Sequence, residues 1–183
     1  MRLGTCLLFC FTLWPALGQA QSCPPPNDIS VKIDGLLSEV QSARSDREAG
    51  PIVTQMWVLW KTAPDARAQA LLTEGVEGIR LTDYRAAETV LGQLITYCPT
   101  YPEGFNQRAF ARFLSGRYDL ALEDLDAALA LDPRHVAARA GRVLTLHALG
   151  RADEAQDELR AALKLNPWLP ERHMLMRLPG IEL

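Results

Sequence analysis

Apolar residues recur three and four positions apart along most of the chain, which is the spacing of one face of an α-helix. In the first such stretch they are Ile29, Ile33, Leu36, Leu37 and Val40. This pattern predicts an amphipathic helix over residues 29–44. A second helix is expected to reach Lys61, beginning either at the capping-box sequence Ser45-Asp46-Arg47-Glu48 or near Pro51.

From residue 68 onward the pattern of helix signals repeats with a period of about 34 residues. The prolines that end each unit are Pro99, Pro133 and Pro167, and the small residues of each second helix are Ala87, Ala121 and Ala155. Proline ends a helix because it cannot continue the hydrogen-bond ladder, and small residues let two helices cross closely. The sequence therefore predicts three helix-turn-helix units, over residues 68–101, 102–135 and 136–169.

This pattern resembles the tetratricopeptide repeat, a helix-turn-helix unit of 34 residues, most closely in residues 102–135. The resemblance implies an all-α protein, a right-handed α-solenoid of such units. Residues 29–67 are then expected to form a helical hairpin, a degenerate repeat that covers the open end of the array, and residues 170–183 a capping helix. Caps are expected because the terminal units of a solenoid must shield an otherwise exposed apolar face.

Charged residues recur at equivalent places in the units. Arg108 and Arg142 lie in the predicted first helices, and Asp124 and Glu158 lie in the predicted second helices. We interpret them as two ion pairs, Arg108 with Asp124 and Arg142 with Glu158, because each would otherwise be partly buried without compensation. The alternative is that the arginines bind a carboxylate of a partner.

Residues 1–20 have the layout of a secretory signal peptide: Arg2, then an uncharged apolar run, then small residues before a cut expected after Ala20. Residues 21–28, with three successive prolines, are expected to be an extended tether. The sequence thus predicts an exported protein, most simply a periplasmic one. Two alternatives would anchor it in a membrane, namely retention of the signal segment or lipidation at Cys23.

Cleavage would leave Cys23 and Cys98 as the only cysteines in an oxidising compartment. They either form a disulfide or remain two independent thiols, since sequence does not supply the required geometry. Their separation and the absence of a CxxC motif give no indication of redox catalysis.

Composition and motifs argue against several classes of function. With 183 residues, 48% of them hydrophobic, and a formal net charge of -3, the chain has a sizeable core and no basic surface of the kind that binds nucleic acid. Its histidines, His135, His147 and His173, do not lie at metal-ligand spacing, and there is no glycine-rich phosphate loop or GxSxG motif. We therefore expect no enzyme activity, no cofactor and no metal site.

The resemblance implies a binding surface on the concave face, which the first helix of each unit lines. The residues at those positions are Leu72, Val76, Ile79, Asn106, Phe110, Phe113, Leu144 and His147. They suggest a protein partner that presents a peptide or a helix; the alternative for Phe110 and Phe113 is packing between repeats.

Some family members bind a C-terminal carboxylate with lysine, asparagine and arginine on this face. Here Asn106 is present, but the third unit has Ala137 and Gly141, so this mode is expected to be missing. Trp57 and Trp60 are interpreted as core anchors and not as a ligand site. The predicted function is a protein-interaction scaffold of the cell envelope; the alternative is an anchored structural component of the envelope.

Overall fold

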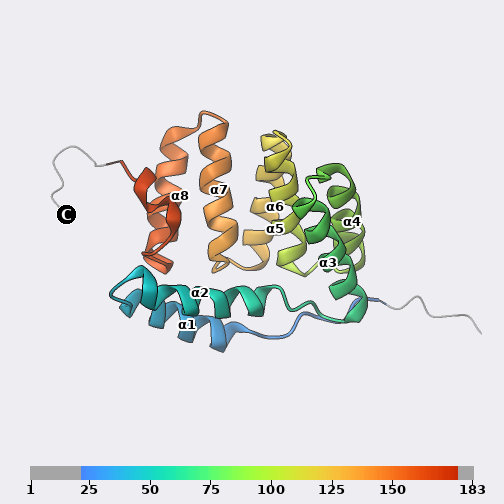
Figure 1. The fold of residues 1–183 in the computed structure, drawn as a ribbon, viewed down its shortest axis with the longest axis horizontal. Coiled ribbons are helices and arrows are strands. Elements are labelled where there is room, and N and C mark those ends of the chain that lie inside the picture. The colour runs from blue at the N-terminus through green and yellow to red at the C-terminus, as the bar shows by residue number, and fades with distance from the viewer. Residues whose placement is uncertain (1–21, 177–183) are drawn as a thin grey trace, which may run out of the picture.

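The structure is a computed structural model, which describes residues 22–176. This range contains eight α-helices and one short 3-10 helix, with no strand within it. The helices are α1 (Ser30–Ser42), α2 (Asp46–Trp60), α3 (Ala66–Arg80), α4 (Tyr84–Tyr97), α5 (Pro102–Leu114), α6 (Tyr118–Leu131), α7 (Val136–Ala148), α8 (Ala152–Leu165) and η1 (Pro170–Met174). Helices α3 to α8 stand side by side, and α1 and α2 run across their lower ends (Figure 1).

The six upright helices form three antiparallel pairs with a regular spacing. The second helix of each pair begins at Tyr84, Tyr118 or Ala152, which are 34 residues apart. The turn before it contains a residue with positive φ, Gly116 (76°) and Gly150 (73°) in the last two pairs and Thr82 (60°) in the first. Glycine adopts this conformation without strain, so the first turn carries a local cost of about 1–2 kcal/mol. The all-α helical-repeat prediction is confirmed.

Small residues at the helix crossings explain how closely the pairs pack. The equivalent alanines Ala87, Ala121 and Ala155 are all buried. A side chain added at Gly75 would lie 2.5 Å from Cγ of Leu91 on the neighbouring helix. Helices α3 and α4 therefore touch at a point where no larger residue fits.

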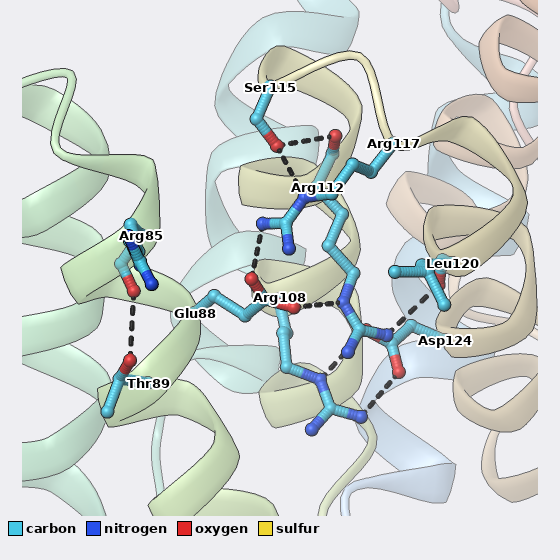
Figure 2. A network of polar contacts seen from close by, with 9 residues as sticks. All are labelled: Arg85, Glu88, Thr89, Arg108, Arg112, Ser115, Arg117, Leu120 and Asp124. Atoms are coloured by element: carbon cyan, nitrogen blue, oxygen red, sulfur yellow. Dashed lines mark hydrogen bonds and ion pairs between the residues drawn. The ribbon is translucent and has the colours of Figure 1, made fainter.

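Both predicted ion pairs are present. Arg108 contacts the nearly buried carboxylate of Asp124 at 2.7 Å, and Arg142 contacts Glu158 at 2.8 Å. Arg112 extends the first pair into a network, because it contacts both Asp124 and Glu88 at 2.8 Å (Figure 2).

This network joins the first two repeat pairs, since Glu88 lies on α4 and its arginine partners lie on α5 and at the start of α6. Burial raises the pKa of Glu88, but the hydrogen bonds from Arg112 and Arg117 outweigh this effect and hold it below its ordinary value. Glu88 therefore stays ionised and links the units by charge as well as by packing.

The hairpin of α1 and α2 lies elsewhere than expected. It does not cover the open end of the array beside α3 and α4; it crosses beneath the array and packs against α7, α8 and Leu169 (Figure 1). The buried residues of this contact are Ile33, Leu37, Val40, Ala49, Ile52, Met56, Trp60, Val136, Ala162 and Leu169. The apolar run 56–60 explains the difference, because α2 has apolar residues on several faces and must contact both α1 and the array.

The hairpin is fastened to the points where one repeat pair joins the next. Cys23 forms a disulfide with Cys98, at the end of α4, with Cα atoms 5.1 Å apart. At the equivalent position after α6, the carboxylate of Asp132 accepts a hydrogen bond of 3.1 Å from the indole N–H of Trp60. Farther along, the side-chain amide of Gln41 donates to the carbonyl of Lys164 at the end of α8. Together, the hairpin and the segment 22–29 before it, which contains Cys23, form a strap that is tied to all three pairs.

Helix α2 begins at the capping box. The Ser45 hydroxyl accepts a hydrogen bond from the backbone N–H of Glu48, and the Glu48 carboxylate accepts one from the backbone N–H of Arg44. Pro51 therefore lies inside the helix and does not begin it, which decides between the two starts that the sequence allowed.

The described part of the predicted C-terminal cap is a short turn. Where a capping helix was expected to begin, Pro170–Met174 form a five-residue 3-10 helix with no buried residue. Leu169 fills the core, and Gln156 of α8 holds the turn through the Met174 carbonyl and the Met176 N–H. The rest of the predicted cap, residues 177–183, and the predicted signal segment, residues 1–20, lie outside the described residues.

Tyr101 provides a test of how the strap is fastened. Its buried hydroxyl donates a 2.7 Å hydrogen bond to the Trp60 carbonyl, and burial together with the nearby charge of Glu103 raises its pKa above 10. A raised pKa in the folded state means stability that is fully present below about pH 10 and lost as the pH rises further. We expect Tyr101→Phe to lower the free energy of unfolding by about 1 kcal/mol at pH 7 and to make its decline above pH 10 shallower.

Urea unfolding of wild type and Tyr101→Phe between pH 7 and 11 measures the free energy of unfolding of both proteins as a function of pH. Tyr97 also has a raised pKa, caused first by its hydrogen bond to Asp65, so part of the alkaline decline should remain in the variant. Parallel curves for wild type and Tyr101→Phe would contradict the assignment.

Candidate functional site: the groove between the strap and the repeats

A cavity of about 660 Å³ lies between α2 and the first helices of the repeat pairs. Helices α5 and α7 form its floor, α2 forms one wall, and the segment 168–171 closes one end. Its principal apolar residues are Val53, Trp57, Val76, Phe110, Phe113, Leu144 and Trp168. The concave face of the array is therefore a groove with a second side supplied by the strap.

Five of the eight residues predicted to bind a partner line this groove. They are Val76, Asn106, Phe110, Phe113 and Leu144. Leu72 does not, since it is 1% exposed and packs in the core between α3 and α4; Ile79 packs on the same core. His147 is exposed but lies outside the groove lining.

The two phenylalanines differ in exposure. Phe110 is 48% exposed, which is unusual for a phenylalanine that only packs within the protein. Phe113 is half-buried, and its ring lies 5.4 Å from the ring of Tyr118. Phe113 therefore both packs within the protein and lines the groove. Phe110 faces the groove with about half of its surface exposed.

Sequence reasoning missed the wall formed by α2. Trp60 is 3% exposed and is the core anchor that was predicted, but Trp57 is only half-buried and lines the groove beside Val53. The signal available in the sequence was the run of five apolar residues at 56–60, which indicated contacts on more than one face. It did not indicate which elements those contacts would join.

A buried polar cluster lies beneath the floor. Glu103 is fully buried and accepts hydrogen bonds from the side-chain amides of Asn106 (2.9 Å) and Gln107 (2.6 Å). It also contacts Nε2 of His135 at 3.0 Å. Because Nδ1 of His135 accepts from the backbone N–H of Ala138, the ring proton belongs on Nε2 and points at Glu103. The ring also stacks on Trp60 with centroids 4.4 Å apart.

This cluster bears on the carboxylate-binding mode. One N–H of the Asn106 amide donates to Glu103 and the side chain is only 6% exposed, so little of it is accessible to a ligand. Ala137 and Gly141 supply no cation on the α7 side of the groove. The floor is thus apolar over an acidic group, an arrangement that does not suit a terminal carboxylate.

The charged residues of the groove lie at its two ends. Asp46 and Glu171 line one end, where Asp46 also pairs with Arg172 at 3.0 Å. Lys61 lines the other end, one residue after α2. Because Arg172 offsets the charge of Asp46, the groove is an apolar channel with one net negative charge, from Glu171, at one end and one positive charge, from Lys61, at the other.

The disulfide decides between the alternatives for Cys23. With its sulfur bonded to Cys98, Cys23 has no thiol for a lipid, so the lipidation alternative does not apply to this structure. Among residues 22–176, no helix has the length and hydropathy to span a bilayer. The same range contains no group of three or more histidine, cysteine or acidic side chains that could hold a metal.

Three antiparallel helix pairs, with a groove along the first helices of the pairs, are the architecture of a helical-repeat protein. Residues 112–178 match the family model described as tetratricopeptide repeat. A TPR repeat-containing protein of Rhizobium etli is 27% identical over 115 residues, which cover 63% of this chain and 56% of that protein. The chain thus spans just over half the length of that relative.

Solved structures show the same fold. The first TPR of Spaghetti (RPAP3), bound to the HSP90 peptide SRMEEVD, has a TM-score of 0.57 and 24% identity, covering 59% of this chain and 88% of that one. The TPR2B domain of yeast Sti1 in a complex with pHsp70 has a TM-score of 0.56 and 23% identity, covering 60% and 91%. MamA has a TM-score of 0.52 and 20% identity, covering 72% and 77%. Residues 112–178 thus match a tetratricopeptide repeat, and the chain shares the fold of tetratricopeptide repeat domains, which is typically a non-catalytic scaffold for protein–protein interaction.

Proposed function

We propose that this protein is an interaction scaffold that binds a segment of a partner protein in the groove between α2 and the repeats. The observation that carries the proposal is the apolar cavity of about 660 Å³ with Phe110 half-exposed on its floor. A concave apolar site of this size is typical of ligand binding, and a large exposed aromatic residue within it is a typical anchor for a partner.

The structural neighbours support the kind of partner. The RPAP3 domain is described as bound to a peptide of HSP90, and the Sti1 domain as a complex with pHsp70. We infer a protein or peptide ligand here too, but not one held by its terminal carboxylate, because Asn106 is nearly buried against Glu103 and the arginines of α7 pair with Glu158 outside the groove lining.

We further propose that the protein works in an oxidising compartment, as an exported and periplasmic protein. The Cys23–Cys98 disulfide supports this, because such bonds persist outside the reducing cytosol. Mass spectrometry of the protein from its native cell tests it: we expect a chain that begins at Gln21, and an intact Met1 would contradict cleavage.

A crosslinking pull-down tests the groove itself. We expect the double variant Phe110→Ser and Phe113→Ser to lose the partner that wild type captures, because both anchors become polar. Leu114→Ser is the matched control, since Leu114 is on the same helix, 39% exposed and outside the groove lining. Circular dichroism establishes that each variant is folded. An identical partner set for the folded double variant and wild type would refute the groove assignment.

A further inference from the structure

Helix α2 presents one continuous stripe to the groove. The residues on this stripe are Asp46, Ala49, Gly50, Val53, Trp57 and Lys61. They recur three and four positions apart over the whole 15-residue helix, which is about 22 Å long. Met56 and Trp60 also border the groove but are buried, as is Ala49, whereas Ile52 is buried on the side that packs into the protein. Gly50, Val53, Trp57 and Lys61 remain as a partly exposed helix face along the groove.

Small side chains lie on both sides of the groove. Ala49 and Gly50 lie on the wall, and Ala137, Ala140 and Gly141 lie on the floor. Gly50 precedes Pro51, where the missing Cβ relieves a clash, and no heavy atom lies within 4 Å of the place that a Cβ would occupy. Small residues on facing surfaces allow the main chain of a helix to approach closely.

The polar groups of the floor indicate which backbone conformation the ligand has. The side-chain donors on α5 and α7 that line the groove are Asn106, Gln107 and Thr145. The first two donate to Glu103, and the Thr145 hydroxyl donates to the Gly141 carbonyl. Asn106 and Gln107 each keep a second amide N–H, but both side chains are nearly buried, so an extended peptide lying on this floor would find few accessible side-chain donors for its carbonyls. An α-helix satisfies its backbone groups internally.

The charges at the two ends indicate a direction. A helix has a partial positive charge at its N-terminus and a partial negative charge at its C-terminus. The end of the groove with Glu171 and the Asp46–Arg172 pair has one net negative charge and suits the N-terminus, and Lys61 suits the C-terminus. A bound helix in this direction runs parallel to α2.

We propose that the occupant of the groove is an amphipathic α-helix of a partner protein, which lies alongside α2 with its N-terminus at the Asp46–Glu171 end. Its apolar face contacts Trp57 and Val53 on one side and Phe110 and Leu144 on the other. The strap is then half of the binding site and not only a fastening. This inference rests on the proposed function, since it specifies the ligand class of the same groove.

The test uses a fluorescent peptide of about 15 residues, the length of α2, with blocked ends and leucines spaced three and four apart among alanine, glutamate and lysine. Two comparison peptides have the same composition in scrambled order and the same order with a central proline. Fluorescence anisotropy with the full chain measures binding. We expect the helical peptide to bind about tenfold or more tightly than either comparison peptide.

Two protein variants locate the binding on α2. Trp57→Ser, on the groove stripe, is expected to weaken binding about tenfold or more, and Val58→Ser is the matched control, because Val58 is the next residue of the helix, 62% exposed and outside the groove lining. Equal binding of the proline peptide, or no binding of the helical peptide to wild type, would overturn the helix assignment. If Phe110→Ser weakens binding and Trp57→Ser does not, the ligand binds in the groove but does not contact α2, and this inference is refuted. If neither variant has an effect, the proposed function is refuted as well.

Discussion

Trp60→Ala is expected to cost about 4 kcal/mol of the free energy of unfolding, the largest effect that we expect from a single substitution in this protein. The side chain is 3% exposed and fills the core between α2 and the repeats. Truncation creates a large cavity and removes the hydrogen bond to Asp132 and the stacking on His135. For a chain of this length, such a loss lowers the melting temperature by roughly 10 °C.

The loss should be concentrated in the strap. Without Trp60, α2 loses its contact with the junctions between the repeat pairs, so we expect the amides of α1 and α2 to exchange with solvent faster than those of α5 and α6. Urea unfolding and hydrogen exchange measure the two expectations.

Trp57→Ala is the control for Trp60→Ala. Trp57 lies three residues earlier on the same helix but is half-buried, so its truncation is expected to cost about 1–2 kcal/mol. Trp60→Phe keeps an aromatic ring, although a smaller one, and loses the indole N–H. This substitution is also expected to lower the free energy of unfolding by about 1–2 kcal/mol. If Trp60→Ala were as stable as Trp57→Ala, the strap would not depend on Trp60.

The repeat pairs could be predicted from the sequence because their determinants are local. Gly116 and Gly150 have the positive φ of a turn, and prolines follow each pair within a few residues of the helix end. Each of these signals acts within one helix pair and recurs with the period of the repeat. The ion pair of Arg108 with Asp124 was predictable for the same reason, since its two residues lie in one pair of helices.

The strap could not be predicted because its determinants are distant and occur once. Trp60 meets Asp132 across 72 residues, and Gln41 meets Lys164 across 123. No period marks these residues, and several alternative surfaces could bury the same apolar face. The side of the groove that α2 forms was therefore not predicted. The residues of the array that line the groove, Phe110 and Leu144 among them, followed from their positions in the repeats.

Equivalent repeat positions did not share one role. Leu72 and Asn106 occupy the same place in successive units, and both are buried, at 1% and 6% exposure. Asn106 still borders the groove, whereas Leu72 belongs to the core of α3 and α4. Repeat position predicts the side of the helix, while the neighbouring element decides whether that side stays open.

The Cys23–Cys98 disulfide gives the second large effect. It links residues 75 positions apart, and restricting a loop of that length in the unfolded chain stabilises the native state by up to about 4.5 kcal/mol on a chain-entropy model, with 2–4 kcal/mol typical of measured cases. We expect Cys23→Ser to lower the free energy of unfolding by about 3 kcal/mol. Cys23 is the better residue to change, because Cys98 is 1% exposed and its replacement also disturbs the core.

Reduction of wild type by dithiothreitol is the matched comparison for Cys23→Ser. Both break the same bond and should give the same urea midpoint, whereas Cys98→Ala should fall below both because it also removes a buried sulfur. The repeat pairs themselves should remain folded in all three, since their contacts do not pass through Cys23. A midpoint that reduction leaves unchanged would show that the bond contributes nothing, and that the noncovalent contacts of the strap, those of Trp60 among them, hold it against the array.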